Sequence, residues 1–314
     1  MREIRLKRLA AALGIIATTA SFSTPAMSAW PLPTPGTPDQ VAQLVAQSTS
    51  IKQVPSNLLP PLISAGSDTA VAYYSVTANG CVGETQCVFG RTSSNKTIFL
   101  IGDSHAQMWL PSLVPMATHL GYRLVLEWLP NCPAASVSVQ NPASHTPYQA
   151  CTWFRATAIA NVRSTNPALV LITDRTANVR NSTGGLISDA TWEAAERTTI
   201  LDMKSPRTKV VVIGDITRFN LTLPDCLGVY RTEVQKCSVR NPNPLVHTHI
   251  AAEWSAAQAT GVTDFNPQPW LCLSVCSPII GHMVAYYDSG HVSATYAVFL
   301  SSVWGGELHH LLTP

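Results

Sequence analysis

The sequence predicts an α/β fold, a three-layer α/β/α sandwich built around a mainly parallel β-sheet. The first observation is that, from Lys96 onward, short apolar runs rich in β-branched residues alternate with longer segments of helical character. The second is that glycine or proline stands at the end of several helical segments. Because such alternation is typical of parallel strands joined by helices, we expect helices on both faces of the sheet.

The elements follow in order along the chain. Strands are expected at Thr97–Ile101, Arg123–Trp128, Ala168–Ile172 and Lys209–Ile213, with a weaker fifth strand at Gly261–Phe265. Helices are expected at Pro38–Ser48, Ala106–Leu120, Cys151–Ser164, Asp189–Met203, Leu245–Ala259 and Ser293–Trp304. Gly121 ends the second of these helices, and Ser293 caps the last. Residues 216–243 are expected to form a long loop.

The N-terminus has the pattern of an export signal. Four basic residues precede the short apolar stretch Leu9–Ala20, and small residues near Ala29 offer a cleavage site. The stretch is short for a transmembrane helix, which needs about 20 residues, although an uncleaved membrane anchor stays an alternative. We therefore expect a signal peptide at residues 1–28, a proline-rich spacer and lead-in at 29–75, and a catalytic domain at 76–314.

The charge of the chain argues against nucleic-acid binding. Its formal net charge is +2, of which residues 1–28 contribute +3, so the remainder carries −1. A near-neutral surface provides no electrostatic attraction for a phosphate backbone. The sequence therefore predicts a protein with no nucleic-acid partner.

The eight cysteines predict disulfides. An even number of cysteines in an exported chain is typical of a disulfide framework. Their spacing suggests four local pairs: Cys81–Cys87, Cys132–Cys151, Cys226–Cys237 and Cys272–Cys276. A zinc site at the last pair is the alternative, but no second pair stands at zinc-ribbon spacing. His247 and His249 lack a third ligand in the sequence, so we expect no metal.

Two short segments carry the candidate chemistry. Ser104 follows the first strand in the segment Gly102-Asp103-Ser104-His105, and Asp288 and His291 stand three residues apart before the last helix. A serine hydroxyl needs a positioned base to become a nucleophile, and the base needs a partner that fixes its tautomer. Both segments belong at the carboxyl edge of the sheet, where ligands bind in such folds. Asp103 is expected to tie down the turn.

Each segment also has a simpler explanation. The tetrapeptide at Ser104 is compatible with an ordinary strand-to-helix turn that has a capping serine. Asp288 and His291 are compatible with a capping aspartate beside a surface histidine. The hypothesis of a catalytic site depends on the two segments meeting in space.

The quoted motifs resemble those of the SGNH/GDSL hydrolase superfamily, and most closely the SGNH domain associated with acyltransferase-3 proteins. The shared features are the Cys81 and Cys87 pair, the Gly-Asp-Ser-His form of the nucleophile segment, Asn131-Cys132-Pro133, the Cys272 and Cys276 pair, and the Tyr-Asp-x-x-His-x-Ser ending. The resemblance implies an SGNH-hydrolase-like, flavodoxin-like fold. It implies that Ser104 is the nucleophile, His291 the general base and Asp288 its orienting partner.

The resemblance does not extend to the oxyanion donors of that family. A glycine block expected after the second strand is replaced by Leu129–Pro133, and a Gly-x-Asn-Asp block after the third strand by Thr173–Arg175. The Ser104 amide is the first donor expected. The other candidates for oxyanion or substrate contacts are Gly102, Asn131, Arg175 and Asn178.

The function implied by the resemblance is that of an extracytoplasmic serine O-acyltransferase, most often transferring acetyl to cell-envelope carbohydrate. Its expected partners are an envelope glycan or glycolipid and a separate membrane acyltransferase that supplies the acyl group, and no cofactor is expected. A secreted or periplasmic location follows from the signal peptide. The alternatives are a carbohydrate or lipid esterase of the same fold, or a non-catalytic envelope binding protein.

Overall fold

The computed structural model describes residues 30–77, 79–82 and 87–312, so the predicted signal peptide lies outside the described residues. The helices are α1 (Pro38–Ser48), α2 (Ala70–Tyr74), α3 (Ser104–Met108), α4 (Leu110–Leu120), α5 (Gln149–Thr165), α6 (Asp189–Met203), α7 (Leu223–Val229), α8 (Ile250–Thr260), α9 (Ala294–Phe299) and α10 (Ser301–Leu312). Within this part of the chain, no helix is long and apolar enough to cross a bilayer.

The central sheet has six strands in the order β1-β3-β2-β4-β5-β7. They are β1 (Val88–Gly90), β2 (Thr97–Gly102), β3 (Arg123–Trp128), β4 (Leu169–Thr173), β5 (Lys209–Ile213) and β7 (Thr263–Phe265). β1 pairs antiparallel with β3, and all other pairs are parallel. Without β1 this is the flavodoxin-like order, in which the second strand lies outside the first. The predicted fold class is confirmed.

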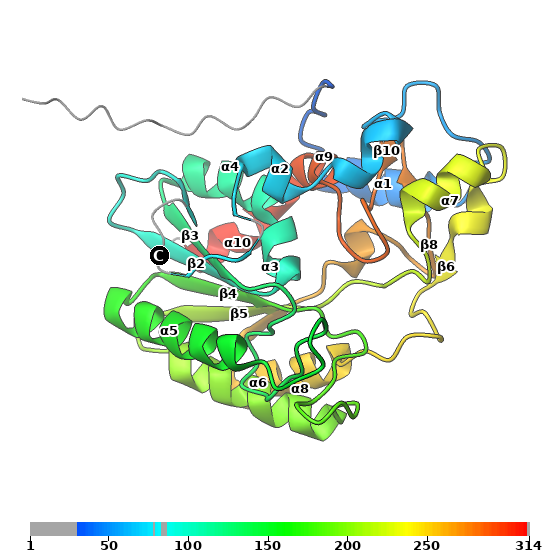
Figure 1. The fold of residues 1–314 in the computed structure, drawn as a ribbon. Coiled ribbons are helices and arrows are strands. Elements are labelled where there is room, and N and C mark those ends of the chain that lie inside the picture. The colour runs from blue at the N-terminus through cyan, green and yellow to red at the C-terminus, as the bar shows by residue number, and fades with distance from the viewer. Residues whose placement is uncertain (1–29, 78, 83–86, 313–314) are drawn as a thin grey trace, which may run out of the picture.

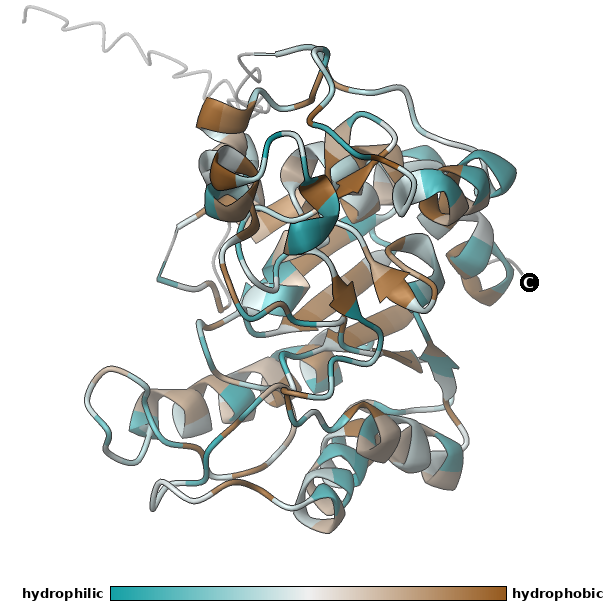
Figure 2. Cartoon of the chain, turned by 90° about the vertical axis from the view of Figure 1, so that its right-hand side faces the viewer, coloured by the Kyte–Doolittle hydropathy of each residue, from teal (hydrophilic) through white to brown (hydrophobic). Residues whose placement is uncertain are grey.

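Helices cover both faces of the sheet (Figure 1). Alternate residues of β2 point to opposite faces, as a strand requires. Ile98 and Leu100 belong to the core shared with α4, α9 and α10, whereas Phe99 and Ile101 belong to the core shared with α5, α6 and α8. In Figure 2 the strands in the centre are mostly hydrophobic, and hydrophilic residues lie along the helices around them. The molecule is therefore a three-layer sandwich with two hydrophobic cores.

The structure corrects several element boundaries. The helix expected at Ala106–Leu120 is two helices, α3 and α4, because Pro111 lacks the N–H that would continue the first. The last helix is also divided, at Leu300. The helix expected from Leu245 begins only at Ile250, because the Asn243 side chain accepts the Leu245 amide in a turn.

Other short elements were not expected. The edge strand β1 has only three residues, too few for a periodic signal. Four short strands form two small antiparallel pairs, β6 (Val239–Arg240) with β8 (Val275–Cys276) and β9 (Ile279–Ile280) with β10 (Met283–Val284). The segment expected as a long loop also contains α7.

The lead-in segment packs on the rest of the chain. Val41 and Val45 of α1 are buried in one of the two cores. The backbone of Leu59 accepts from the Val284 amide and donates to the His282 carbonyl, which ties this segment to β10. The structure also contains the four disulfides Cys81–Cys87, Cys132–Cys151, Cys226–Cys237 and Cys272–Cys276, the pairs that spacing suggests.

Candidate active site

Ser104 lies where β2 ends and α3 begins, at the carboxyl edge of the sheet. Gly102, two residues before it, lies against the neighbouring strand β4. A Cβ atom at Gly102 would stand 1.9 Å from the Thr173 carbonyl oxygen, so only glycine fits there. This close approach fixes where the chain leaves the sheet and hence where Ser104 is presented.

Asp103 holds the turn around Ser104 in place. Its carboxylate accepts the amide of His105 at 2.8 Å, capping α3, and the amide of Arg175 at 3.1 Å. Asp103 thereby joins the end of β2 to the loop after β4. This is the structural role expected for Asp103.

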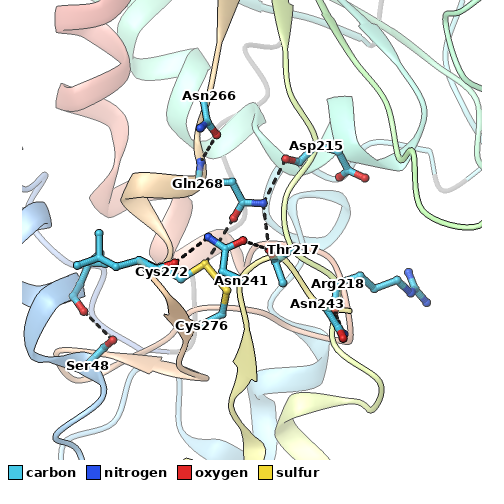
Figure 3. The surroundings of a disulfide bond; sticks show 12 residues. Ser48, Asp215, Thr217, Arg218, Asn241, Asn243, Asn266, Gln268, Cys272 and Cys276 are labelled. Atoms are coloured by element: carbon cyan, nitrogen blue, oxygen red, sulfur yellow. Dashed lines mark hydrogen bonds between the residues drawn. A yellow bond between two sulfur atoms is a disulfide. The ribbon is translucent and has the colours of Figure 1, made fainter. Parts of the chain in front are cut away.

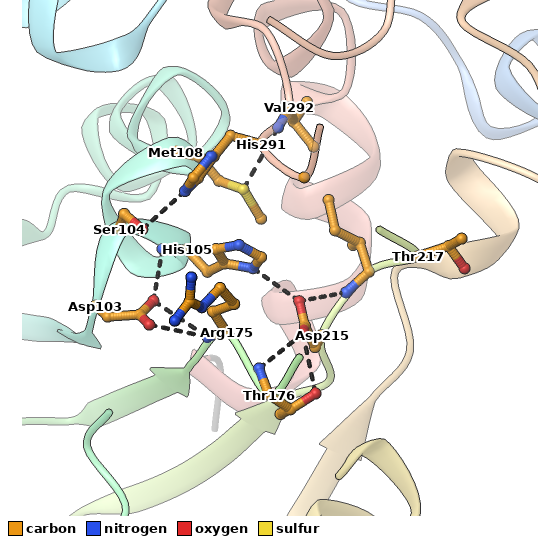
Figure 4. A network of polar contacts seen from close by, with 12 residues as sticks. Asp103, Ser104, His105, Met108, Arg175, Thr176, Asp215, Thr217, His291 and Val292 are labelled. Carbon is orange, nitrogen blue, oxygen red and sulfur yellow. Dashed lines mark hydrogen bonds and ion pairs between the residues drawn. The ribbon is translucent and has the colours of Figure 1, made fainter. Parts of the chain in front are cut away.

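The segment from Asp288 to His291 forms a tight turn that presents the histidine ring to Ser104. One Asp288 carboxylate oxygen accepts the amides of Gly290 and His291 at 2.7 and 2.8 Å. The other lies 2.7 Å from Nδ1 of His291, and Nε2 of His291 lies 2.7 Å from Oγ of Ser104. The two segments therefore meet, as the hypothesis of a catalytic site required (Figure 4).

The surroundings of His291 favour its neutral form. Burial lowers the pKa of His291, and the nearby His105 lowers it further, while Asp288 opposes both effects. Burial would raise the pKa of Asp288, but the hydrogen bonds from His291 and from two amides outweigh it and bring that pKa to about 2. A neutral imidazole beside an ionised carboxylate is the state that can accept a proton from a serine hydroxyl.

A second histidine–aspartate pair lies directly beneath the first. Nδ1 of His105 is 2.7 Å from the Asp215 carboxylate, and both side chains are buried. Thr176 donates to the same carboxylate from its amide and its hydroxyl. The rings of His105 and His291 meet edge to face with centroids 4.8 Å apart. Sequence reasoning missed this pair, although Asp215 follows a buried strand at the same sheet edge.

The loop that carries Asp215 is braced from the side of the Cys272–Cys276 disulfide (Figure 3). The Gln268 side chain donates to the Thr217 hydroxyl at 3.1 Å and reaches the Asp215 carbonyl at 3.5 Å. Thr217 in turn contacts the Asn241 side chain at 2.6 Å. These bonds fix the chain at residues 215–218, which follow β5 at the same edge of the sheet as Ser104.

Three of the four residues expected to contact the oxyanion or the substrate line one cavity of about 550 Å³. They are Asn131, Arg175 and Asn178. Gly102 does not line it, and its carbonyl accepts the Leu129 amide at the end of the sheet. The His105 amide is bound to Asp103. This leaves the Ser104 amide as the oxyanion donor that the turn itself can supply.

His247 and His249, for which the sequence offers no third metal ligand, have a carboxylate neighbour in the structure. Nδ1 of His249 lies 2.7 Å from Asp189 at the start of α6, and Nε2 of His247 lies 3.6 Å from the same oxygen. The His249 ring is buried and stacks on Trp192. Asp189 is 58 residues earlier in the chain than His247, so no local pattern indicates this grouping.

Comparisons with known proteins agree with this architecture. The family model described as the SGNH domain fused to AT3 domains matches residues 74–305. The comparison with curated proteins found no match. Among solved structures, the periplasmic domain of a lipopolysaccharide acetyltransferase from Salmonella ser. Paratyphi A superimposes with a TM-score of 0.54 at 21% identity, covering 69% of this chain and 84% of that one.

A carbohydrate acetylesterase from Sinorhizobium meliloti is a more distant structural match. It superimposes with a TM-score of 0.42 at 14% identity, covering 69% of this chain and 99% of that one. At these identities the likeness concerns the fold.

Proposed function

Because this chain belongs to the family of SGNH domains that occur fused to AT3 domains, we propose that it is an extracytoplasmic serine O-acyltransferase. It transfers an acyl group, most simply acetyl, to a hydroxyl of cell-envelope carbohydrate. The observation that carries the proposal is the continuous series of hydrogen bonds from Asp288 through His291 to Ser104. Residues from two distant segments are aligned there in the order that acyl transfer requires.

The first half-reaction forms an acyl-serine. His291 takes the proton of the Ser104 hydroxyl through Nε2 as Oγ attacks the acyl carbonyl. The bond between the acyl carbon and the donor oxygen breaks, and the protonated His291 gives its proton to that leaving oxygen. Asp288 holds Nδ1 and stabilises the imidazolium that forms in between.

The second half-reaction transfers the acyl group to the acceptor. His291 takes the proton of an acceptor hydroxyl, whose oxygen attacks the acyl-serine carbonyl. The new ester leaves, and Ser104 recovers its proton from His291. In both half-reactions the developing oxyanion is stabilised by the Ser104 amide, with the side chain of Asn131 as a further donor.

The acceptor site is the cavity beside the nucleophile turn. Its lining is mixed, and its polar part includes Asn131, Gln140 and Arg180. Hydroxyl-rich ligands are bound by such groups through hydrogen bonds. The periplasmic acetyltransferase among the structural neighbours supports a sugar acceptor, in keeping with the polar part of this cavity.

The location outside the cytoplasm is supported by the disulfides. All four bonds involve cysteines that are close in the sequence and buried in the fold. Disulfides of this kind persist in oxidising compartments. The acyl donor is proposed to come from a separate membrane acyltransferase.

The experiment is intact-mass analysis of the purified protein after exposure to an activated acetyl ester, with and without envelope glycan. We expect a single acetyl adduct that is absent in Ser104→Ala, and acetylated glycan when acceptor is added. Ser104→Ala is a matched control, because it removes only one hydroxyl. A folded protein that gives neither adduct nor turnover above this variant contradicts the proposal. If the acetyl group is instead lost from Ser104 to water, at a rate that added glycan does not change, the protein is an esterase.

A further inference from the structure

Arg175 and Arg218 approach the proposed active site from two different loops. Arg175 follows β4 and lines the cavity, and its amide is bound by Asp103, the residue before Ser104. Arg218 follows β5, and its guanidinium lies next to Gly290, where a Cβ atom would stand 3.1 Å from Nη1. One arginine therefore stands beside the nucleophile turn and the other beside the turn that carries the base.

Neither guanidinium has a partner within the described part of the chain. No hydrogen bond or ion pair engages the side chain of Arg175 or of Arg218, and Nε of Arg175 is buried without an acceptor. In Figure 4 every dashed line at Arg175 reaches its backbone, and none reaches its guanidinium. Buried donors are normally satisfied, so an orphaned one at a cavity wall indicates a missing acceptor.

The carboxylates nearest to the two arginines are already engaged. Asp103 binds the amides of His105 and Arg175, Asp215 binds His105 and Thr176, and Asp288 binds His291. The residues that line the cavity include Arg175, Arg180 and His145 but no acidic residue, and Arg218 lies outside this lining. Among the described residues, no carboxylate thus forms a hydrogen bond or an ion pair with either guanidinium, although the charges of Asp288 and Asp215 attract Arg218.

The two arginines also repel each other. Burial lowers the pKa of Arg218, and the charge of Arg175 lowers it further, while Asp288 and Asp215 oppose both effects without cancelling them. Bringing like charges together in this way costs free energy. That cost is recovered when a ligand brings the opposite charge, because a guanidinium binds carboxylate and phosphate oxygens through paired hydrogen bonds.

We propose that Arg175 and Arg218 form a binding site for an anionic group of the acceptor, a carboxylate or a phosphate on the sugar that enters the cavity. This rests on the proposed function, since it specifies the substrate of the same site. The shared chemistry is an oxyanion held between two guanidinium groups. The acceptor is accordingly an acidic or phosphorylated glycan and not a neutral one.

The test measures binding and needs no turnover. Ser104→Ala protein is titrated with glucose, glucuronate and glucose 6-phosphate by ligand-observed NMR at low salt. We expect at least one anionic sugar to bind about tenfold or more tightly than glucose, as charge-assisted hydrogen bonds require. Preference between glucuronate and the phosphate identifies which anion the site takes. Equal binding of the neutral sugar and both anionic sugars overturns the proposal.

Variants assign the effect to the two arginines. Arg175→Gln and Arg218→Gln should each remove most of the preference, whereas Arg175→Lys should retain part of it. Arg163→Gln is the matched control, because Arg163 is exposed on α5 and paired with Asp202, far from the cavity lining. If Arg163→Gln loses as much of the preference for anionic sugars as the other two variants, the effect comes from the overall charge of the protein and the proposal is overturned. Because binding is measured in a variant that lacks the Ser104 hydroxyl, a negative result here does not affect the acyl-serine experiment. In the same way, failure to form an acyl-serine does not affect the binding result.

Discussion

Two histidine–aspartate pairs lie side by side at the carboxyl edge of the sheet, and they behave in opposite ways. In each pair Nδ1 lies 2.7 Å from a carboxylate oxygen. Yet the pKa of His291 is lowered, whereas the pKa of His105 is raised. The same contact between the same residue types thus accompanies a lowered pKa in one histidine and a raised pKa in the other.

The surroundings of each pair account for the difference. Burial opposes the charge on both rings, but His105 lies near two carboxylates, Asp215 and Asp103, which together outweigh it. His291 instead faces His105, whose positive charge adds to the effect of burial. The deeper histidine, whose pKa is raised, therefore favours the neutral form of the outer one. The lesson is that a pairwise contact does not set a pKa by itself.

The largest expected effect comes from removing the outer histidine. His291→Gln should reduce acyl-serine formation by about a thousandfold or more, because it removes the ring nitrogen that lies 2.7 Å from Oγ of Ser104. Its free energy of unfolding should change less than its activity, since glutamine keeps an amide donor beside Asp288. Activated-ester turnover and urea unfolding are the measurements. Retained turnover would assign the base to another residue.

Removing the inner histidine should act mainly on stability. His105→Leu leaves the Asp215 carboxylate buried without its charged partner, and such a change costs about 3–5 kcal/mol of unfolding free energy. His105→Gln is the control, because it keeps a donor near Asp215 and should lose less. Urea unfolding compares the two variants. Equal stability of His105→Leu and the native protein would show that the pair is not a buried ion pair.

The pH dependence of activity tests whether the charge of His105 affects the pKa of His291. Protonation of His291 abolishes its role as base, so activity falls as pH drops through the pKa of His291. Because that pKa is lowered, the midpoint of the acid limb should lie below the usual value of about 6.5. In His105→Gln the midpoint should move to higher pH, since a neighbouring positive charge is lost. A midpoint that does not move would contradict electrostatic coupling between the rings.

The smallest effect is expected from changing Tyr287, whose ring packs on His291. Tyr287 stacks on His291 with ring centroids 5.2 Å apart and planes 11° from parallel. Tyr287→Leu should lower turnover a few-fold, as stacking contributes about 0.5–1.5 kcal/mol. Tyr287→Phe keeps the ring and should retain near-native turnover in the same ester assay. A similar loss in both variants would indicate a role for the hydroxyl and not for stacking.

Local patterns predicted the regular elements well. The strands β3 and β5 and the helices α1 and α6 have the bounds expected from periodicity and capping residues. The errors fall where a single proline or a turn interrupts a continuous pattern, as at Pro111, or where a strand is too short to show one, as at β1. Periodicity reports the average character of a segment, not a break within it.

The candidate site was only partly accessible from the sequence. Ser104, Asp288 and His291 were identified because they stand in recognisable local motifs. Arg218 and Asp215 stand in no such motif, so only their positions after a buried strand could have suggested them.

The sequence by itself determined the alternation of strands and helices, the turn at Ser104 and the grouping of cysteines into neighbours. All of these depend on residues a few positions apart. Only the tertiary structure decided that His105 meets Asp215, that Arg175 and Arg218 approach the two turns of the site, and that Asp189 lies beside His249. The crossover connections of the sheet bring these side chains together, and their charge states depend on burial and on neighbours from distant segments.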